Sequence, residues 1–294
     1  MNNSPELTRR TILGSLVMAS AAALETTLDN SVASAAHPGP EALVQTQKVL
    51  TVSEGKKLIA RAIVRFPLVQ KALQKGLVII AKGTTTTYIA KEILKTEIPH
   101  GSFVIGSVYP EKGGKKLTPG ETLKEIILVD GQRRQDVSLE EAVKQLRSGD
   151  VVLKGANALN YRRQLAAGLI GVPSPSAGTT GKIIPAILGT KAHLIIPVGL
   201  EKEIGGNMVE IVKAMQTPAT TLGDDLSMVL YSGILFTEIE ALRTLTGVSA
   251  LHVASGGIGG AEGSTRLLLR GSEEQVKKAL EIIADIQGEP PFVH

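Results

Sequence analysis

Apolar and polar positions along the first half of the chain predict helices and strands in turn. Apolar residues recur at helical spacing over residues 53–75, which predicts a helix that Ser53 caps and Pro67 interrupts. The unbroken apolar run 77–81 follows and predicts a strand buried on both faces, as in parallel sheets. A loop of small residues then leads into a helix over 88–94. This order of strand, small-residue loop and helix opens a βα unit.

The next hundred residues repeat these signals. A capping box at Ser138 opens one helix. The pattern predicts further helices and buried strands at residues 138–147, 150–154, 182–188 and 193–198. Gly205 and Gly206 mark a boundary. We therefore expect residues 53–205 to form an α/β domain with a mainly parallel, Rossmann-like sheet flanked by helices.

The order of predicted helices and strands changes after this boundary. The pattern predicts, in order, strand, helix, strand, strand and helix at residues 226–231, 235–245, 250–254, 265–269 and 273–286. This βαββα order is close to the ferredoxin-like pattern with its last strand missing or irregular. Residues 206–294 are therefore expected to form a smaller C-terminal, ferredoxin-like α+β domain.

The first residues have the pattern of an export signal. Arg9 and Arg10 precede a mildly apolar stretch, and small residues around Ala35 fit a signal-peptidase site. Residues 1–35 thus resemble a twin-arginine signal, whose pathway exports folded proteins, and residues 36–52 are expected to be a linker. The apolar stretch is too short to span a bilayer, so we expect no permanent membrane anchor and a periplasmic or secreted protein. The alternative is a disordered basic tail.

Composition excludes several kinds of chemistry. The chain has 294 residues and no cysteine, which excludes disulfides, thiolate nucleophiles and cysteine-bound metal centres. No two of its five histidines have a metal-binding local spacing, so we expect no metal and no cofactor. The net charge is +4 without a block of basic residues, and only 3% of the residues are aromatic. The composition therefore gives no sign of a nucleic-acid-binding surface.

Two loops of small residues are candidates for holding an anion. Each lies before a helix, where free backbone N–H groups and the helix dipole favour negative charge. Threonine hydroxyls add donors, and the second loop also has a lysine; its spacing does not match a P-loop. The expected contacts are Gly83, Thr84, Thr85, Thr86, Thr179, Thr180 and Lys182. The alternative is that the threonines only cap their helices.

A third loop, residues 256–263, is rich in glycine but fails the dinucleotide fingerprint because Glu262 stands where the last glycine belongs. Either the loop is a flexible strand connection, or Glu262 is a lone carboxylate that a ligand can approach closely. Glu262, Glu201 and Lys154 are the candidates for a proton-handling catalytic group.

About residues 53–200 resemble the sugar-phosphate isomerase and CoA-transferase-like superfamily. The loop from Gly83 resembles one that receives a phosphorylated ligand there, and residues 150–198 look like the branch of ribose-1-phosphate isomerases and initiation-factor regulatory subunits. That branch has Gly-Ala-Asp where this chain has Asn157, and its isomerases also use a cysteine. The resemblance therefore implies ligand binding, with Asn157 among the contacts, while an amide cannot replace the acid–base aspartate.

Three functions follow from these observations. The first is an exported protein that binds a small anionic ligand bearing phosphate or carboxylate. The second is an isomerase or transferase of the superfamily. The third is a structural protein whose tail domain drives homo-oligomerisation. Sugar phosphates and CoA esters are mainly intracellular, so the export signal and the resemblance favour different ligands.

Overall fold

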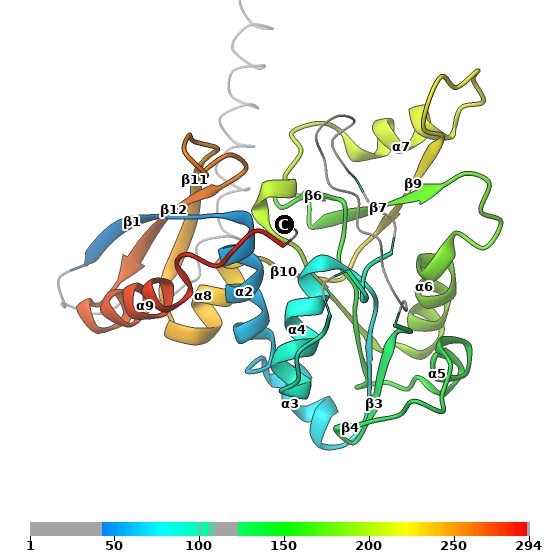
Figure 1. Ribbon diagram of the computed structural model, residues 1–294, viewed down its shortest axis with the longest axis horizontal. Coiled ribbons are helices and arrows are strands. Elements are labelled where there is room, and N and C mark those ends of the chain that lie inside the picture. The colour runs from blue at the N-terminus through cyan, green and yellow to red at the C-terminus, as the bar shows by residue number, and fades with distance from the viewer. Residues whose placement is uncertain (1–42, 100, 106–107, 109–122, 293–294) are drawn as a thin grey trace, which may run out of the picture. The chain divides into compact units, whose positions relative to one another are not determined.

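The apolar runs of the chain form the centre of a six-stranded sheet in the computed structural model, which describes residues 43–99, 101–105, 108 and 123–292. The strands, in spatial order, are β10 (Ile234–Phe236), β8 (His193–Pro197), β5 (Val151–Leu153), β2 (Leu77–Ile80), β3 (Ile126–Val129) and β4 (Gln132–Arg133). The first four are parallel, and β3 and β4 are antiparallel to their neighbours. This mixed sheet with its helices confirms the predicted α/β class (Figure 1).

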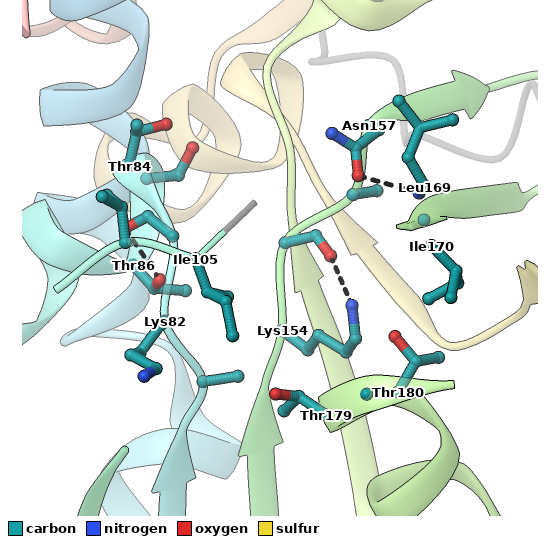
Figure 2. Close-up of a pocket in the computed structure, with 18 of the residues that line it drawn as sticks. Lys82, Thr84, Thr86, Ile105, Lys154, Asn157, Leu169, Ile170, Thr179 and Thr180 are labelled. Atoms are coloured by element: carbon teal, nitrogen blue, oxygen red, sulfur yellow. Dashed lines mark hydrogen bonds between the residues drawn. The ribbon is translucent and has the colours of Figure 1, made fainter. Parts of the chain in front are cut away.

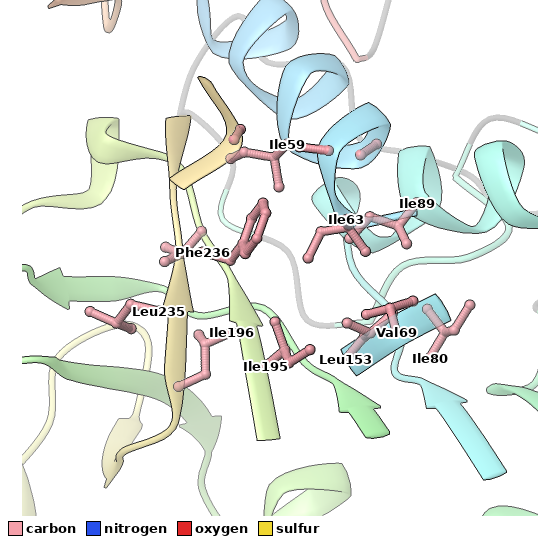
Figure 3. Close-up of a cluster of buried hydrophobic side chains, with 14 of the residues drawn as sticks. Ile59, Ile63, Val69, Ile80, Ile89, Leu153, Ile195, Ile196, Leu235 and Phe236 are labelled. Atoms are coloured by element: carbon pink, nitrogen blue, oxygen red, sulfur yellow. The ribbon is translucent and has the colours of Figure 1, made fainter. Parts of the chain in front are cut away.

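Helices cover this sheet with aliphatic side chains. The helices are α2 (Val52–Ile63), α3 (Pro67–Gln74), α4 (Thr84–Leu94), α5 (Leu139–Gln145) and α6 (Gly178–Thr190). Ile59 of α2 lies over Phe236, and Ile63 of α2 and Ile89 of α4 lie further along, towards Ile80 of β2 (Figure 3). The Phe236 ring packs edge-on against Phe66, with ring centres 5.2 Å apart. All four residues of β2 are buried, as predicted for a strand covered on both faces.

The start of α2 differs from the expectation. Thr51, not Ser53, is its N-cap: the Thr51 hydroxyl accepts the Glu54 N–H, and the Glu54 carboxylate accepts the Thr51 N–H. A capping box needs Glu or Gln three residues after the cap, and Ser53 has Lys56 there instead. Pro67 does interrupt the helix, because it becomes the first residue of α3.

A second, antiparallel sheet joins the two ends of the described chain. It contains β1 (Val44–Leu50), β12 (Thr265–Gly271) and β11 (Ser249–Ser255), with β12 in the middle. Helices α8 (Glu238–Thr246) and α9 (Glu273–Ile286) pack on each other and on this sheet. β1 occupies part of the segment expected as a linker, 36–52, and its partner lies at the other end of the sequence. The expected signal, 1–35, and the first part of that linker lie outside the described residues.

A third sheet holds β6 (Ala158–Asn160), β7 (Leu165–Gly171) and β9 (Leu226–Tyr231). Helix α7 (Met208–Gln216) packs on β9, and a short 3-10 helix (Leu200–Lys202) precedes it. β9 was expected to belong to a ferredoxin-like tail, but it pairs with β7. The expected helix over 235–245 begins instead with β10, which pairs with β8. Each of the three described sheets therefore joins strands from both sides of Gly205.

Candidate functional site

Two helices begin at the same edge of the six-stranded sheet. β2 and β5 are parallel neighbours, so their carboxyl ends meet there, and β2 leads directly into α4. A cavity of about 920 Å³ lies at this edge, and its lining contains both predicted loops, residues 83–86 and 178–180 (Figure 2). Ligands of open α/β sheets bind at the carboxyl ends of the strands. The fold thus brings together two loops that lie far apart in the sequence.

The two helix starts at the cavity have no side-chain cap. Gly83 is the N-cap of α4 and Ala177 is the N-cap of α6. Neither residue has a side-chain atom that can accept a hydrogen bond from its helix. The first N–H groups of a helix have no acceptor within it. By contrast, α2, α5, α7, α8 and α9 all have side-chain caps, and α3 begins with proline. Among the described helices, only the starts at the cavity thus keep a full set of donors.

The threonines of these loops divide into two groups. The Thr86 and Thr87 hydroxyls donate to the Gly83 carbonyl at 3.1 and 2.7 Å, so these two residues stabilise their own helix start. The Thr179 hydroxyl donates to Glu125 at 3.3 Å. Thr85 and Thr180 line the cavity, are only 3% and 4% exposed, and form no side-chain hydrogen bond with any described residue. Neither hydroxyl oxygen is among the buried side-chain atoms that lack a partner, so both keep exposed surface and are available to a ligand in the cavity.

The cavity is strongly positive. Four lysines line it: Lys56, Lys82, Lys154 and Lys202. No aspartate or glutamate is among the described lining residues. Of these four lysines, only Lys154 was predicted from the sequence as a site residue. Lys82 could have been found because it directly precedes Gly83, whereas Lys56 and Lys202 come from distant elements and carry no local signal.

Lys154 lies at the end of β5 and contacts only neutral groups. Its Nζ atom is 3.3 Å from the Tyr231 hydroxyl, 3.4 Å from the Gly155 carbonyl and 4.7 Å from the centre of the Tyr231 ring. The Tyr231 hydroxyl in turn donates to the Gly155 carbonyl at 2.7 Å. Burial, followed by the charge of Lys202, lowers the pKa of Lys154 to about 8. Burial also raises the pKa of Tyr231, which keeps its hydroxyl protonated.

Lys56 has a similar pKa but a different neighbourhood. Burial and the charge of Lys202 lower its pKa to about 8, while Glu201 and Glu238 act in the opposite direction. Glu238 is 2% exposed and accepts the Leu200 N–H at 3.0 Å. Burial, followed by the charge of Glu201, raises the pKa of the Glu238 carboxyl. Two carboxyl groups therefore lie behind the cavity, near Lys56.

The remaining predicted residues lie in different places. Asn157 lines the cavity, and its Oδ1 atom accepts the Leu169 N–H at 3.0 Å, so the amide connects the loop after β5 to β7. Glu201 is outside the lining, and one of its oxygens is buried without a hydrogen-bond partner. Glu262 is exposed in the β11–β12 connection, where it accepts the Gly260 N–H at 2.9 Å.

Lys182 was expected to contact the ligand, and this expectation is corrected. Its ammonium group pairs with Glu140 of α5, and the residue does not line the cavity. The lining part of α6 stops at Thr180. The physical reason is that only the first turn of a helix presents its N–H groups and side chains to a site at its start. Lys182 lies beyond that turn.

Apolar side chains complete the lining: Val104, Ile105, Val108, Leu169, Ile170 and Phe292. Figure 2 shows Ile105 on one side of Lys154, near Thr86 and Lys82, and Leu169 and Ile170 on the other side. The site therefore combines a cationic, donor-rich part with an apolar part, an arrangement typical of small-molecule sites.

Comparison of the chain with protein-family models, with curated proteins and with solved structures gives no match in any of the three. None of the described helices is long and apolar enough to cross a membrane. The described residues also contain no group of three or more histidines and carboxylates that could hold a metal ion.

Proposed function

We propose that the protein binds a small molecule with at least two anionic groups, phosphate or carboxylate, in the cavity at the starts of α4 and α6. The observation that carries this proposal is the pair of threonines, Thr85 and Thr180, that line the cavity and whose hydroxyls have no hydrogen-bond partner among the described residues. They stand beside the backbone N–H groups of two helices without side-chain caps. Such starts are ready-made anion sites.

Charge and shape support the same ligand class. Four lysines without a lining carboxylate leave an excess of positive charge that an anion neutralises. The cavity of about 920 Å³ is at the upper end of the range for small-molecule sites. Its apolar lining suits a carbon skeleton or ring attached to the anionic groups. A free inorganic anion would leave these apolar side chains in contact with water.

Binding is better supported than isomerisation by a carboxylate. Asn157 stands where the resembling isomerases have their aspartate, and its amide oxygen is already used by the Leu169 N–H. The described lining offers no other carboxylate to replace it. The resemblance and a Rossmann-like arrangement of β2, β5 and β8 remain part of the proposal for ligand binding.

Thermal unfolding with pyrophosphate, an anion with two charged groups, tests the proposal. At constant ionic strength, pyrophosphate at 100 times its Kd should stabilise the protein by about 2.7 kcal/mol, which raises Tm by several degrees. The double variant Thr85→Val/Thr180→Val should lose most of that rise. Thr46→Val on β1 is the matched control and should keep it. An equal rise in the double variant, or no rise with any phosphate or dicarboxylate, contradicts the proposal.

We also infer that residues 1–35 direct export, so that the ligand is met outside the cytoplasm. The support is the arginine pair and the small residues around Ala35. In a bacterial host, the exported chain should begin at Ala36 by intact mass. Replacing Arg9 and Arg10 by lysine should leave the protein unprocessed. Unchanged processing of that variant contradicts the twin-arginine assignment.

A further inference from the structure

We propose that Lys154 is a nucleophilic amine that forms an imine with an aldehyde or ketone group of the anionic ligand. This inference rests on the proposed function, because the bound anion would bring the carbonyl group to the amine. It adds a reaction to the site, which then acts on a carbonyl compound that also bears phosphate or carboxylate.

The partners of Lys154 are unusual for a lysine of this protein. Several other lysines pair with carboxylates on the surface: Lys57, Lys91, Lys95, Lys182 and Lys277. Lys154 has no ion pair with any described residue and contacts a carbonyl, a hydroxyl and a ring face. No negative charge therefore holds the amine in its ammonium form.

Burial makes the neutral amine common near neutral pH. With a pKa of about 8, about a quarter of Lys154 is neutral at pH 7.5, against about 0.1% for a lysine at its ordinary value. The reactive form is thus roughly 200-fold more abundant. Removal from water and a neighbouring cation, here Lys202, are the two established ways to activate a lysine as a nucleophile.

The amine also lies where a bound anion would place a reactive group. In Figure 2, Lys154 stands between the α4 start, marked by Thr84 and Thr86, and the α6 start, marked by Thr179 and Thr180. Both starts and Lys154 line the same cavity, so a ligand with an anionic group at either start can bring its carbonyl group to Nζ. Such fixed geometry replaces a chance encounter and supplies much of the rate of a two-group reaction.

The reaction balances without an oxidant or reductant. The lone pair of neutral Nζ attacks the carbonyl carbon, and the electron pair of the C=O bond moves to oxygen, which takes a proton. The nitrogen gives up its two protons, the oxygen takes up both in total and leaves as water, and the C=N bond remains. Tyr231 is a positioning residue, because its hydroxyl accepts a hydrogen bond from Nζ and fixes the direction of the amine.

Lys56 is the natural rival and is less suited. It has a similar pKa, but Glu201 and Glu238 favour its ammonium form. Its Nζ atom also lies 5.8 Å from the centre of the Phe292 ring, a contact that favours a cation. We therefore assign Lys56 to anion binding and Lys154 to the reaction.

Pyridoxal 5′-phosphate, which carries both an aldehyde and a phosphate, is the test probe. The full chain is treated with one equivalent at pH 7.5, and borohydride then delivers a hydride to the imine carbon and fixes the adduct. Peptide mapping should find Lys154 as the main modified lysine, and pyrophosphate should suppress the adduct. Pyridoxal without phosphate should label Lys154 at least tenfold less. The labelling rate should rise with a midpoint near pH 8.

Two variants separate the reaction from binding. Lys154→Arg keeps the charge but cannot form the imine, so its adduct should fall at least tenfold while pyrophosphate still raises Tm. Lys182→Arg, outside the cavity, should label like the wild type. Wild-type labelling spread over exposed lysines, or equal labelling of Lys154→Arg, overturns the inference. If pyrophosphate still raises Tm in that case, anion binding stands alone; if it does not, both proposals fall.

Discussion

The helix starts of this protein fall into two groups that use the same backbone groups differently. Four helices, α2, α5, α8 and α9, begin with a complete capping box, in which protein side chains take up the free N–H groups. The starts of α4 and α6 have no such side chain, and both lie at the cavity. Capping stabilises a helix by about 1 kcal/mol, so its absence at two starts has a cost.

This difference shows at which helix starts the backbone N–H groups stay available to a ligand. Other helices of the chain do have side-chain caps, for example Thr51, Ser138, Thr237 and Ser272. At α4 the chain places Gly83 at the cap position instead, and the threonines that follow sit inside the helix. We interpret the open starts as donors reserved for a ligand, and the following changes test that interpretation.

The largest effect is expected from a cap introduced at the cavity. Gly83→Asp places a carboxylate where it can accept the Thr85 and Thr86 N–H groups. The backbone at Gly83 is extended, so any residue can adopt it. Calorimetry should show pyrophosphate binding at least about 100-fold weaker, a loss of about 2.7 kcal/mol, because the new carboxylate occupies the N–H groups and repels the anion. Gly83→Ala, which adds no acceptor, should bind nearly as the wild type; equal loss in both variants would refute a role for the free N–H groups.

A smaller effect concerns the buried carboxyl group in the first turn of α8. The pKa of Glu238 is raised from 4.5, so the folded protein holds this proton more tightly than the unfolded chain does. Its contribution to stability is complete below pH 4.5 and is lost as pH rises through the raised folded value. Glu238→Gln keeps the acceptor for the Leu200 N–H and removes this loss.

Thermal unfolding at pH 5 and pH 9 checks this prediction. The Tm of Glu238→Gln minus the Tm of the wild type should be a few degrees larger at pH 9 than at pH 5. The ordinary surface carboxylate Glu281, replaced in the same way, should show no such gain. A gain of the same size at both pH values would mean that Glu238 acts by packing alone.

Removing an existing cap should have a smaller effect, and on stability only. Ser272→Ala deletes the hydroxyl that accepts the Gln275 N–H at the start of α9. Chemical denaturation should show a loss of about 1 kcal/mol in the free energy of unfolding. Pyrophosphate binding should be unchanged. Weaker binding in this variant would show that capped and open starts are not separate in function.

The smallest effect is expected at Lys182. The sequence places it beside the second loop, but the structure pairs it with Glu140 outside the cavity. Lys182→Ala should leave the calorimetric Kd for pyrophosphate within about twofold of the wild type. The matched change inside the cavity, Lys56→Ala, should weaken binding clearly, because Lys56 is the lysine assigned to anion binding. A strong loss in Lys182→Ala would restore the expectation drawn from the sequence.

Features that depend on neighbouring residues, such as the buried strands and the loops after them, could be predicted from the sequence. Features that depend on residues far apart in the chain could not. The runs that became β2, β5 and β8 are continuous and apolar, so their strands and the loops after them were predictable. The loops met at one edge because parallel neighbouring strands require it. Lys56 and Lys202 reach the cavity through the packing of α2 and the turn before α7, which no local pattern encodes.

The errors have the same origin. β1 has four polar residues among its seven, and only its pairing with β12 makes it a strand. β10 has three residues, and two of them, Leu235 and Phe236, lie at the start of the helix expected over 235–245. The charge of Lys182 predicts a contact with the ligand, although its place beyond the first turn of α6 directs it away from the loop. In each case a distant partner or the phase of a helix decided the outcome.

The pairing of β1 with β12 has a consequence for the order of events during synthesis. The ribosome makes β1 about 200 residues before its partner β12. Until β12 emerges, β1 is an open edge, which is a template for aggregation. A chain shortened before β12 leaves that edge unprotected. A transport system that accepts only folded proteins would thus find, in this one sheet, a sign that β12 has been made.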